Sequence, residues 1–337
     1  MRRVTLAEPF RLELSAVEAP VAGPGEALVR IRRIGVCGTD LHAFRGRQPF
    51  FTYPRVLGHE ISGEVVEIGE NAAGLRPGDP CVVSPYQWCG ECIACRQGKT
   101  NCCTRLKLLG VHVDGGLQEY LAVLPRALLR ADGLSLEQMA LVENQSIGAH
   151  AVRRAQLAAG ETVLVIGAGP IGLGVTQFAR RQGARVLLAD VSDKRLDFAR
   201  RWIKPEVCLD AGSDLAAQLS EQTAGDFPTA VFDCTGNPAS MMQSFSFVAN
   251  GGRLILVSIV QGDLSFNDPE FHRRELTVLS SRNATLDDFR DVIQAIAAGQ
   301  IVTEPFTTHR AALDDLVQAF PTWLAPEAGV LKAMVEL

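Results

Sequence analysis

The stretch TVLVIGAGPIG, residues 162–172, is the most informative segment of this 337-residue sequence. Its first five residues predict a buried strand, and three glycines in the pattern GxGxxG follow directly. Gly167 permits a tight turn, Gly169 lets the backbone approach a pyrophosphate, and Gly172 lets the following helix pack on the strand. Pro170 and Ile171 complete the turn. We therefore expect a dinucleotide-binding turn between a strand and a helix.

The segments around this turn alternate between short apolar runs and amphipathic helices. Such alternation predicts a doubly wound parallel sheet with helices on both faces, a Rossmann fold. Strands are expected at residues 162–166, 185–189, 230–232, 253–257 and 276–279.

Asp190 ends the strand after the glycine turn, 23 residues beyond Gly167. A carboxylate there binds the ribose hydroxyls of NAD and repels the 2′-phosphate of NADP, so NAD is the predicted cofactor. Lys194 and Arg195 lie close by in sequence and count against this preference, and Arg195 is itself a candidate cofactor contact. The alternative is a glycine turn of another α/β protein, with Asp190 capping a helix.

The N-terminal part has a different pattern. Apolar and polar residues alternate over residues 28–34 and again over 61–69, which predicts half-buried strands in a β-rich, barrel-like unit. Helical periodicity begins near residue 135, and a further helix is expected at 286–298. A chain of this length exceeds one comfortable core, so two domains are expected.

Composition excludes several classes of protein. The net charge is −5 and both signs are interspersed, so the sequence lacks the clustered basic residues of a nucleic-acid-binding protein. No window of about 18 residues is apolar enough for a membrane span, and no signal peptide is visible. We expect a cytoplasmic protein with a small-molecule substrate. Nine cysteines are many for such a protein, and five lie between Cys89 and Cys103.

These clustered cysteines predict a structural zinc site. Cys89, Cys92, Cys95 and Cys103 have spacings that a single loop can wrap into a tetrahedron. Cys102 is an alternative fourth ligand, although the spacing favours Cys103.

A second metal site is expected from residues scattered along the chain. Cys37 and His59 are a reasonable zinc pair, and catalytic zinc needs a third protein ligand and one open position. Glu143 is the best candidate, and Glu60, next to His59, is a transient one. Asp40 would accept the free N–H of His59. Taken singly, Cys37 is equally a small buried hydrophobe and Glu143 a surface residue.

Together these motifs resemble the zinc-dependent medium-chain dehydrogenase/reductase family over essentially the whole chain. The match rests on residues 37–40 (CGTD), 58–60 (GHE), the four-cysteine lobe and 167–172. The resemblance implies a GroES-like catalytic domain, residues 1–146 and 284–337, and a Rossmann NAD-binding domain, residues 147–283. It also implies catalytic zinc on Cys37, His59 and Glu143, and a homo-oligomer, either dimer or tetramer.

In having glutamate at position 143, the sequence resembles the sorbitol and threonine dehydrogenase branch of the family, which uses glutamate where liver-type alcohol dehydrogenases use cysteine. Finer features at residues 48–57, 100–103, 150–154, 268–272 and 281–284 resemble bacterial L-galactonate/L-gulonate 5-dehydrogenases. The sequence departs from the family at Asn144, where proline is common, and this bears on whether Glu143 is a permanent ligand.

The resemblance implies oxidation of a secondary alcohol of a sugar acid or polyol, a reaction of carbohydrate metabolism. Zinc would lower the pKa of the substrate hydroxyl, and Thr39 would pass its proton through the cofactor ribose to His42. Arg282 is the candidate partner of a substrate carboxylate, with a surface ion pair as the alternative. Phe50 and Phe51 are candidate pocket walls, with core packing as the alternative.

Two other functions stay open at this point. One is a dehydrogenase of sorbitol, threonine or a simple secondary alcohol, which would share the same metal and cofactor sites. The other is a non-catalytic nicotinamide-binding protein, against which the full set of ligand and relay residues argues.

Overall fold

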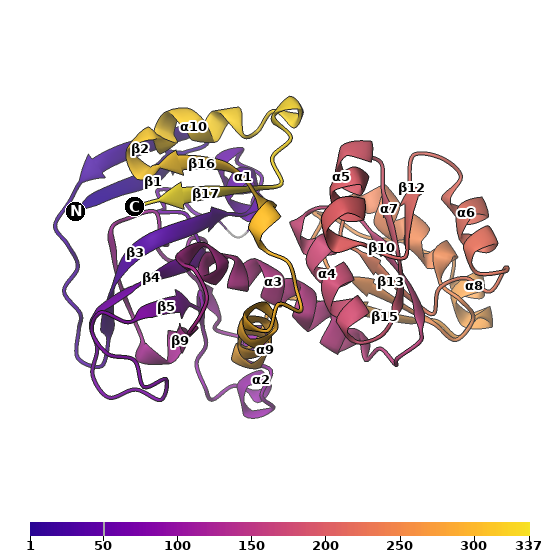
Figure 1. Cartoon of the computed structure of the whole chain (residues 1–337), viewed down its shortest axis with the longest axis horizontal. Coiled ribbons are helices and arrows are strands. Elements are labelled where there is room, and N and C mark those ends of the chain that lie inside the picture. The colour runs from indigo at the N-terminus through magenta and orange to yellow at the C-terminus, as the bar shows by residue number, and fades with distance from the viewer. Residues whose placement is uncertain (50) are drawn as a thin grey trace. The chain divides into compact units, whose positions relative to one another are not determined.

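The computed structural model describes residues 1–49 and 51–337, and the chain folds into two compact units (Figure 1). Unit 1 comprises Met1–Glu143, Thr285–Gly299 and Thr303–Leu337, and unit 2 comprises Asn144–Ala284 and Gln300–Val302. Residues 144–146, 284 and 300–302 thus belong to unit 2, whereas the expected ranges assigned them to the catalytic domain.

Unit 1 is built on a seven-stranded sheet in the order β16-β17-β3-β4-β5-β9, with β8 pairing β3. Its pairs are antiparallel except β16 with β17. The strands are β3 (Ala27–Val36), β4 (Glu60–Glu67), β5 (Pro80–Val83), β8 (Tyr120–Val123), β9 (Leu128–Arg130), β16 (Thr307–Ala312) and β17 (Lys332–Glu336). The apolar residues of the alternating strands point into one core, which includes Val29, Ile31, Ile34 and Val65.

Smaller elements complete unit 1. The chain ends meet in one sheet because β17, the last strand, pairs with β3. The remaining strands are β1 (Arg2–Glu8) with β2 (Arg11–Ala16), and β6 (Tyr86–Gln87) with β7 (Lys107–Leu108). The helices are α1 (Gly38–Phe44), α2 (Ile93–Arg96), α9 (Leu286–Ala297) and α10 (Leu316–Thr322), with 3₁₀ turns at Thr100–Cys102, Pro125–Ala127, Glu304–Phe306, Leu313–Asp315 and Pro326–Ala328.

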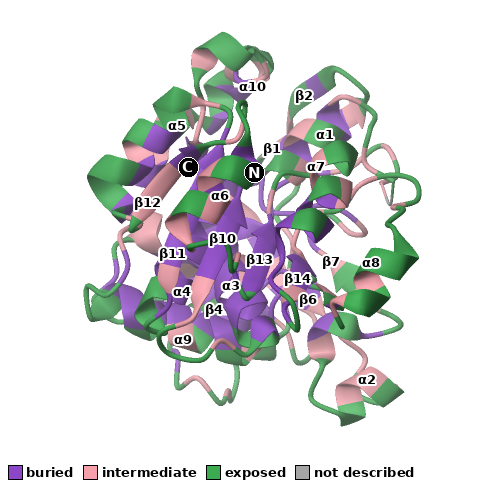
Figure 2. Ribbon diagram, turned by 90° about the vertical axis from the view of Figure 1, so that its right-hand side faces the viewer, coloured by how far each residue is buried: buried purple, intermediate pink, exposed green. Residues whose placement is uncertain are grey.

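Unit 2 is a six-stranded, all-parallel sheet in the order β12-β11-β10-β13-β14-β15, which confirms the predicted Rossmann fold. The strands are β10 (Thr162–Ile166), β11 (Arg185–Asp190), β12 (Val207–Asp210), β13 (Ala230–Asp233), β14 (Arg253–Leu256) and β15 (Thr277–Ser280). Figure 2 shows the central strands β10 and β13 as buried, which explains their apolar sequences. The helices are α4 (Pro170–Arg181), α5 (Asp193–Phe198), α6 (Leu215–Gln222), α7 (Pro238–Gln243) and α8 (Asp268–Arg273), with a π-turn at Ala199–Ile203 and a 3₁₀ turn at Ser244–Phe247.

One strand of unit 2 was not expected from the sequence. β12 has four residues, of which Val207 and Cys208 are only half-buried, so its apolar signal is short and weak. The helical pattern near residue 135 proves to be one long helix, α3 (Leu136–Ala155), which continues past Glu143 into unit 2.

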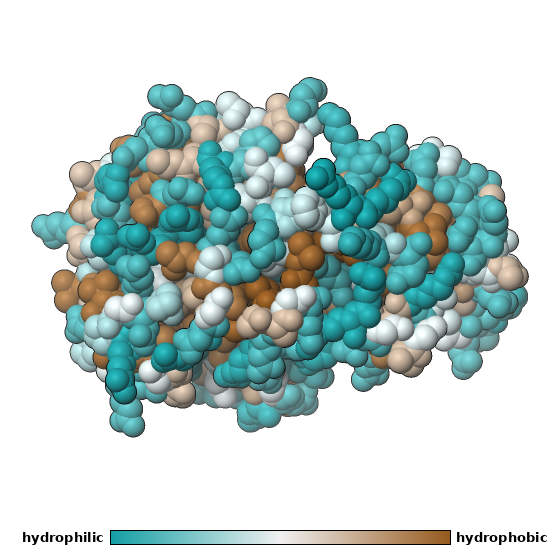
Figure 3. Space-filling model, in the orientation of Figure 1, coloured by the Kyte–Doolittle hydropathy of each residue, from teal (hydrophilic) through white to brown (hydrophobic). Residues whose placement is uncertain are grey.

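In the described part of the chain, no helix is both long and apolar enough to cross a membrane. The face drawn in Figure 3 is mainly hydrophilic, with hydrophobic residues scattered over it.

Candidate metal and cofactor sites

The end of β3 and the start of α1 position the first candidate metal ligand. Cys37 is the N-cap of α1, and its backbone N–H donates to Asp40 Oδ2 at 2.9 Å. The other oxygen, Asp40 Oδ1, accepts from the N–H of Gly58 at 3.3 Å. Burial of this carboxyl raises its pKa, although His59 and these N–H groups lower it. Asp40 therefore ties the loop of Cys37 to the segment that carries His59.

β3 and β4 bring three candidate ligands together. Gly35 pairs with Glu60 in the antiparallel register, and a Cβ on Gly35 would lie 2.0 Å from Glu60 Oε2. Only glycine leaves room there for the carboxylate. The donor atoms of Cys37, His59 and Glu60 all lie within 4.8 Å of one another.

The state of His59 supports a metal at this point. Its Nδ1 is buried without a hydrogen-bond partner among the described residues, and lies 3.6 Å from Asp40 Oδ1, too far for the expected hydrogen bond. Burial alone would lower the pKa of His59, but Asp40 and Cys37 outweigh it and raise that pKa well above 6.5. A thiol, an imidazole and a carboxylate crowded around a buried site are the donor set of a catalytic zinc.

Glu60 is also held by a residue that sequence reasoning missed. Lys332 Nζ donates to both carboxylate oxygens of Glu60, at 2.6 and 2.8 Å, and to the carbonyl of Val36 at 3.2 Å. Burial alone would lower the pKa of Lys332, but the charge of Glu60 keeps it above 10.5. The sequence signal for this residue was a lysine beside the apolar residues of β17, where a buried charge needs a partner.

Glu143 lies in this region but outside the group of three donors. The hydroxyl of Tyr86, a second residue that the sequence did not single out, donates to Glu143 Oε1 at 2.5 Å. Burial raises the pKa of Glu143 and, to a larger extent, that of Tyr86. Of the four expected catalytic-site ligands, three therefore gather and the fourth bonds to a tyrosine.

The expected proton-relay residues both lie on α1. Thr39 is half-buried near the start of the helix, and His42 is exposed one turn later. Partial burial of its ring and the charges of Arg45 and Arg47 lower the pKa of His42 below 6.5. His42 is therefore neutral at pH 7 and able to accept a proton.

The second candidate metal group is the predicted four-cysteine lobe. The sulfurs of Cys89, Cys92, Cys95 and Cys103 gather within 4.8 Å, whereas Cys102 is exposed outside this group. Backbone N–H groups donate to the sulfurs of Cys89 and Cys103 at 3.3 to 3.4 Å. The N–H groups of Cys95 and Thr104 lower the pKa of Cys92 to about 5. Removal from water and the neighbouring thiol of Cys92 raise the pKa of Cys95 to about 12. Four sulfurs gathered in a closed set fit a structural zinc, which binds cysteines as thiolates.

The glycine turn of unit 2 has the shape that a dinucleotide requires. A Cβ on Gly172 would lie 1.7 Å from the carbonyl oxygen of Gly167, so only glycine fits this close approach. Gly169 is the N-cap of α4, with Pro170 and Ile171 following it, and a Cβ on Gly169 would meet no atom within 4 Å. The helix N-terminus thus opens onto free space, as binding of a pyrophosphate requires.

Asp190 lies at the carboxyl end of β11, beside this turn. Its Oδ2 accepts from the N–H of Ala168 at 2.6 Å and its Oδ1 from the N–H of Ser192 at 2.8 Å. The N-cap of α5 is Ser192, so Asp190 does not cap that helix, which was the alternative. Arg195 is exposed with its Nη1 3.8 Å from Asp190 Oδ2, so a cation does accompany the acidic group.

The candidate substrate residues have different surroundings. Phe51 is half-buried against the core of unit 1, and its ring meets that of Tyr53 edge to face at 4.8 Å. Phe50 lies outside the described residues. Arg282 is exposed in unit 2, just after β15.

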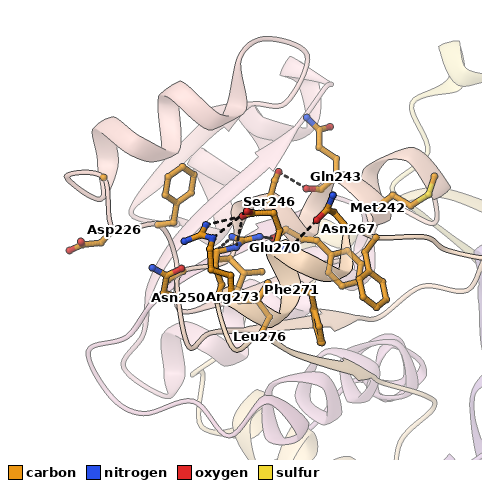
Figure 4. A pocket seen from close by; sticks show the side chains of 17 residues that line it. Asp226, Met242, Gln243, Ser246, Asn250, Asn267, Glu270, Phe271, Arg273 and Leu276 are labelled. Carbon is orange, nitrogen blue, oxygen red and sulfur yellow. Dashed lines mark hydrogen bonds and ion pairs between the residues drawn. The ribbon is translucent and has the colours of Figure 1, made fainter.

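A cavity of about 610 Å³ in unit 2 has no part in these sites (Figure 4). Phe245, Phe266 and Phe271 line it together with an ion pair of Glu270 and Arg273 at 2.8 Å. Neither the glycine turn nor Asp190 is among its lining residues.

Two family models match the chain. The alcohol dehydrogenase GroES-like domain matches residues 23–132, and the zinc-binding dehydrogenase domain matches residues 170–298. The chain is also 42% identical over 328 residues to L-galactonate-5-dehydrogenase of Escherichia coli K12, covering 97% of this chain and 96% of that protein. The chain belongs to the zinc-binding alcohol dehydrogenase family. This confirms the resemblance and the GroES-like and Rossmann fold class.

This dehydrogenase has further relatives of similar length. It is 35% identical to 2-dehydro-3-deoxy-L-galactonate 5-dehydrogenase of Pseudoalteromonas atlantica, covering 96% of this chain and 95% of that one. The structure of the alcohol dehydrogenase RspB from Escherichia coli CFT073 with NADH matches with a TM-score of 0.93 at 28% identity, covering 100% and 99% of the two chains. The protein is accordingly a zinc-dependent oxidoreductase, and not the non-catalytic nicotinamide-binding protein considered above.

Proposed function

We propose that this dehydrogenase oxidises one secondary hydroxyl of a sugar acid of the L-galactonate or L-gulonate type to a ketone, with NAD as the hydride acceptor. The observation that carries the proposal is the similarity, over nearly the whole chain, to the L-galactonate-5-dehydrogenase of Escherichia coli. The reaction converts a CH–OH group and NAD⁺ into a C=O group, NADH and one proton.

The residues of unit 1 would prepare the alcohol. Cys37, His59 and Glu60 would hold the zinc, which would supply a Lewis acid that lowers the pKa of the substrate hydroxyl. Thr39 would accept the hydroxyl proton and His42, which is neutral at pH 7, would deliver it to water. NAD supplies the acceptor for the hydride that leaves the same carbon.

The residues of unit 2 would bind the cofactor. The pyrophosphate would lie at the N-terminus of α4, and Asp190 would accept hydrogen bonds from the ribose hydroxyls. RspB, which is similar in fold, holds NADH. We propose NAD over NADP because the buried carboxylate of Asp190 would repel a 2′-phosphate more strongly than exposed Arg195 would attract it.

Arg282 is the proposed partner of the substrate carboxylate because it is an exposed residue and a guanidinium suits bidentate pairing. We also propose a cytoplasmic homo-oligomer. Nine cysteines, none of them in a disulfide, fit a reducing compartment. The edge strand β15 has exposed Thr277, Val278 and Ser280, which favours pairing with a second copy.

The test is a matched panel of acids and their neutral polyols, followed by NADH absorbance. Sorbitol is L-gulonate with a hydroxymethyl group in place of the carboxylate, and galactitol has the same relation to L-galactonate. We expect kcat/KM at least about 100-fold higher for the acids, which corresponds to about 2.7 kcal/mol for one charge-assisted contact. Arg282→Met should remove this preference without changing turnover of the polyols.

Two results would contradict the proposal. Equal kcat/KM for the acids and their polyols would exclude a contact with the substrate carboxylate. The enzyme would then be a polyol dehydrogenase of the sorbitol type. Activity confined to L-threonine or 2-butanol would assign the site to another secondary alcohol.

A further inference from the structure

Tyr86 is a buried residue whose one polar atom points at the metal region. It lies in β6, its side chain is almost fully buried, and its hydroxyl donates to Glu143 Oε1 at 2.5 Å. We propose that Tyr86 is a positioning residue of the catalytic metal centre: its hydroxyl holds Glu143 outside the group of Cys37, His59 and Glu60. One position on the metal is thereby left open for the substrate hydroxyl.

Tyr86 is itself rigidly placed, as a positioning residue must be. β6 pairs with β7, with Tyr86 opposite Leu108. The ring of Tyr86 meets the ring of Phe289 edge to face, at 6.0 Å between centroids and 90° between planes. Phe289 is fully buried in α9. Two separate elements therefore fix the direction of the Tyr86 hydroxyl.

Glu143 has a reason to move if this bond is removed. It is a buried carboxylate, and carboxylates are ordinary zinc ligands. Loss of its hydrogen bond would leave a buried oxygen unsatisfied, which costs more than a lost surface contact. The nearby metal centre offers the strongest available replacement. A fourth protein ligand would close the position that catalysis requires.

The cation of Lys332 strengthens this division of roles between the two glutamates. Lys332 donates to both oxygens of Glu60, whereas Glu143 accepts a hydrogen bond from the neutral phenol of Tyr86. Glu60 is thus fixed beside Cys37 and His59, whereas Glu143 is not part of this group of donors within 4.8 Å of one another. The inference rests on the zinc centre of the proposed function and is independent of which alcohol is the substrate.

The experiment measures whether the open position is available, without using turnover. Cobalt replaces zinc at the catalytic site while the four-cysteine lobe keeps its zinc, and imidazole is titrated into the holoenzyme while the visible cobalt spectrum is recorded. In Tyr86→Phe, Glu143 competes for the open position, so we expect the Kd of imidazole to rise about tenfold. We also expect slower metal loss to a chelator.

A double-mutant cycle separates positioning from loosened packing. The amide in Glu143→Gln is a far weaker zinc ligand than a carboxylate. In the Glu143→Gln background the Tyr86→Phe change should therefore leave the Kd of imidazole within twofold. Tyr53→Phe is the matched control because its hydroxyl donates to a backbone carbonyl, that of Ala43 at 2.5 Å. It should leave the cobalt spectrum unchanged.

Three outcomes would overturn the inference. The Kd of imidazole could stay unchanged or fall in Tyr86→Phe. The double variant could keep the full tenfold loss, which would mean that Tyr86 acts through packing. Glu143→Gln alone could lose the catalytic metal about 100-fold more readily, which would make Glu143 a ligand. This last measurement holds even if Tyr86→Phe does not fold.

Discussion

The two metal groups of this dehydrogenase are built in opposite ways. The four-cysteine lobe takes all its candidate ligands from one stretch of 15 residues, Cys89 to Cys103, most of which are exposed or half-buried. The group of Cys37, His59 and Glu60 is assembled where β3 and β4 pair. Lys332, near the other end of the chain, forms an ion pair with Glu60. The first group is local, and the second depends on the sheet of unit 1.

The two groups therefore differ in what stabilises them: metal binding in the lobe, and burial in unit 1 at the assembled group. In the lobe, the described residues Asn101 and Cys103 are buried but little else is, so metal binding must supply much of its stability. At the assembled group, Asp40, His59 and Glu60 are all buried, so packing of unit 1 contributes to their placement. Removing ligands should therefore unfold the lobe and merely inactivate the assembled group.

The largest expected effect is on activity. Cys37→Ser should reduce kcat/KM by at least about 10³-fold because Lewis-acid stabilisation is worth several kcal/mol. Elemental analysis should find the zinc content reduced from two ions to one per chain, with little change in Tm. Full metal content with normal activity would show that Cys37 is not a ligand.

The next effect tests the buried charges of the assembled group. Lys332→Met leaves the buried carboxylate of Glu60 without its cation, so the metal-free protein should lose about 3 kcal/mol of unfolding free energy. Urea denaturation measures this loss. The double variant with Glu60→Gln should recover most of it, and a double variant as unstable as the single one would contradict the explanation.

The lobe should respond differently. Cys95→Ser should weaken zinc binding at the lobe at least about 100-fold, and should make residues 89–103 sensitive to proteases while the rest stays folded. Cys102→Ser is the matched control, because that exposed thiol lies outside the group and should change neither property. Equal effects of the two substitutions would contradict the assignment of Cys103 as the fourth ligand.

The smallest effect concerns proton transfer. The pKa of His42 lies below 6.5, so its neutral ring accepts a proton at pH 7 and loses that ability as the pH falls through its pKa. His42→Ala should lower kcat about tenfold near pH 7 and less at pH 9, where water and hydroxide replace the ring. His272→Ala, at an exposed histidine of unit 2, should leave the pH profile unchanged. An identical profile in both variants would exclude His42 from the relay.

Local sequence was informative wherever one segment contains the whole feature. The spacing of the four cysteines predicted that their sulfurs gather in one group. The apolar run of β10, followed by Gly167 and Gly172, predicted the Rossmann unit. Strand β12 was missed because half-buried Val207 and Cys208 carry almost no apolar signal. For Glu60, by contrast, the sequence predicted only a transient ligand beside His59, because the strand register that places Glu60 opposite Gly35 is not a local property.

The amino-acid sequence by itself determined the parallel sheet, the dinucleotide turn and the cysteine lobe, because each depends on spacing and periodicity within a short stretch. Only the tertiary structure showed that the carboxylate of Glu60 gathers with the donor atoms of Cys37 and His59. The two glutamates are held by Lys332 and Tyr86, which lie 272 and 57 residues away from them in the sequence. Buried charges and hydroxyls select their partners by proximity in space, and no local pattern encodes such a contact.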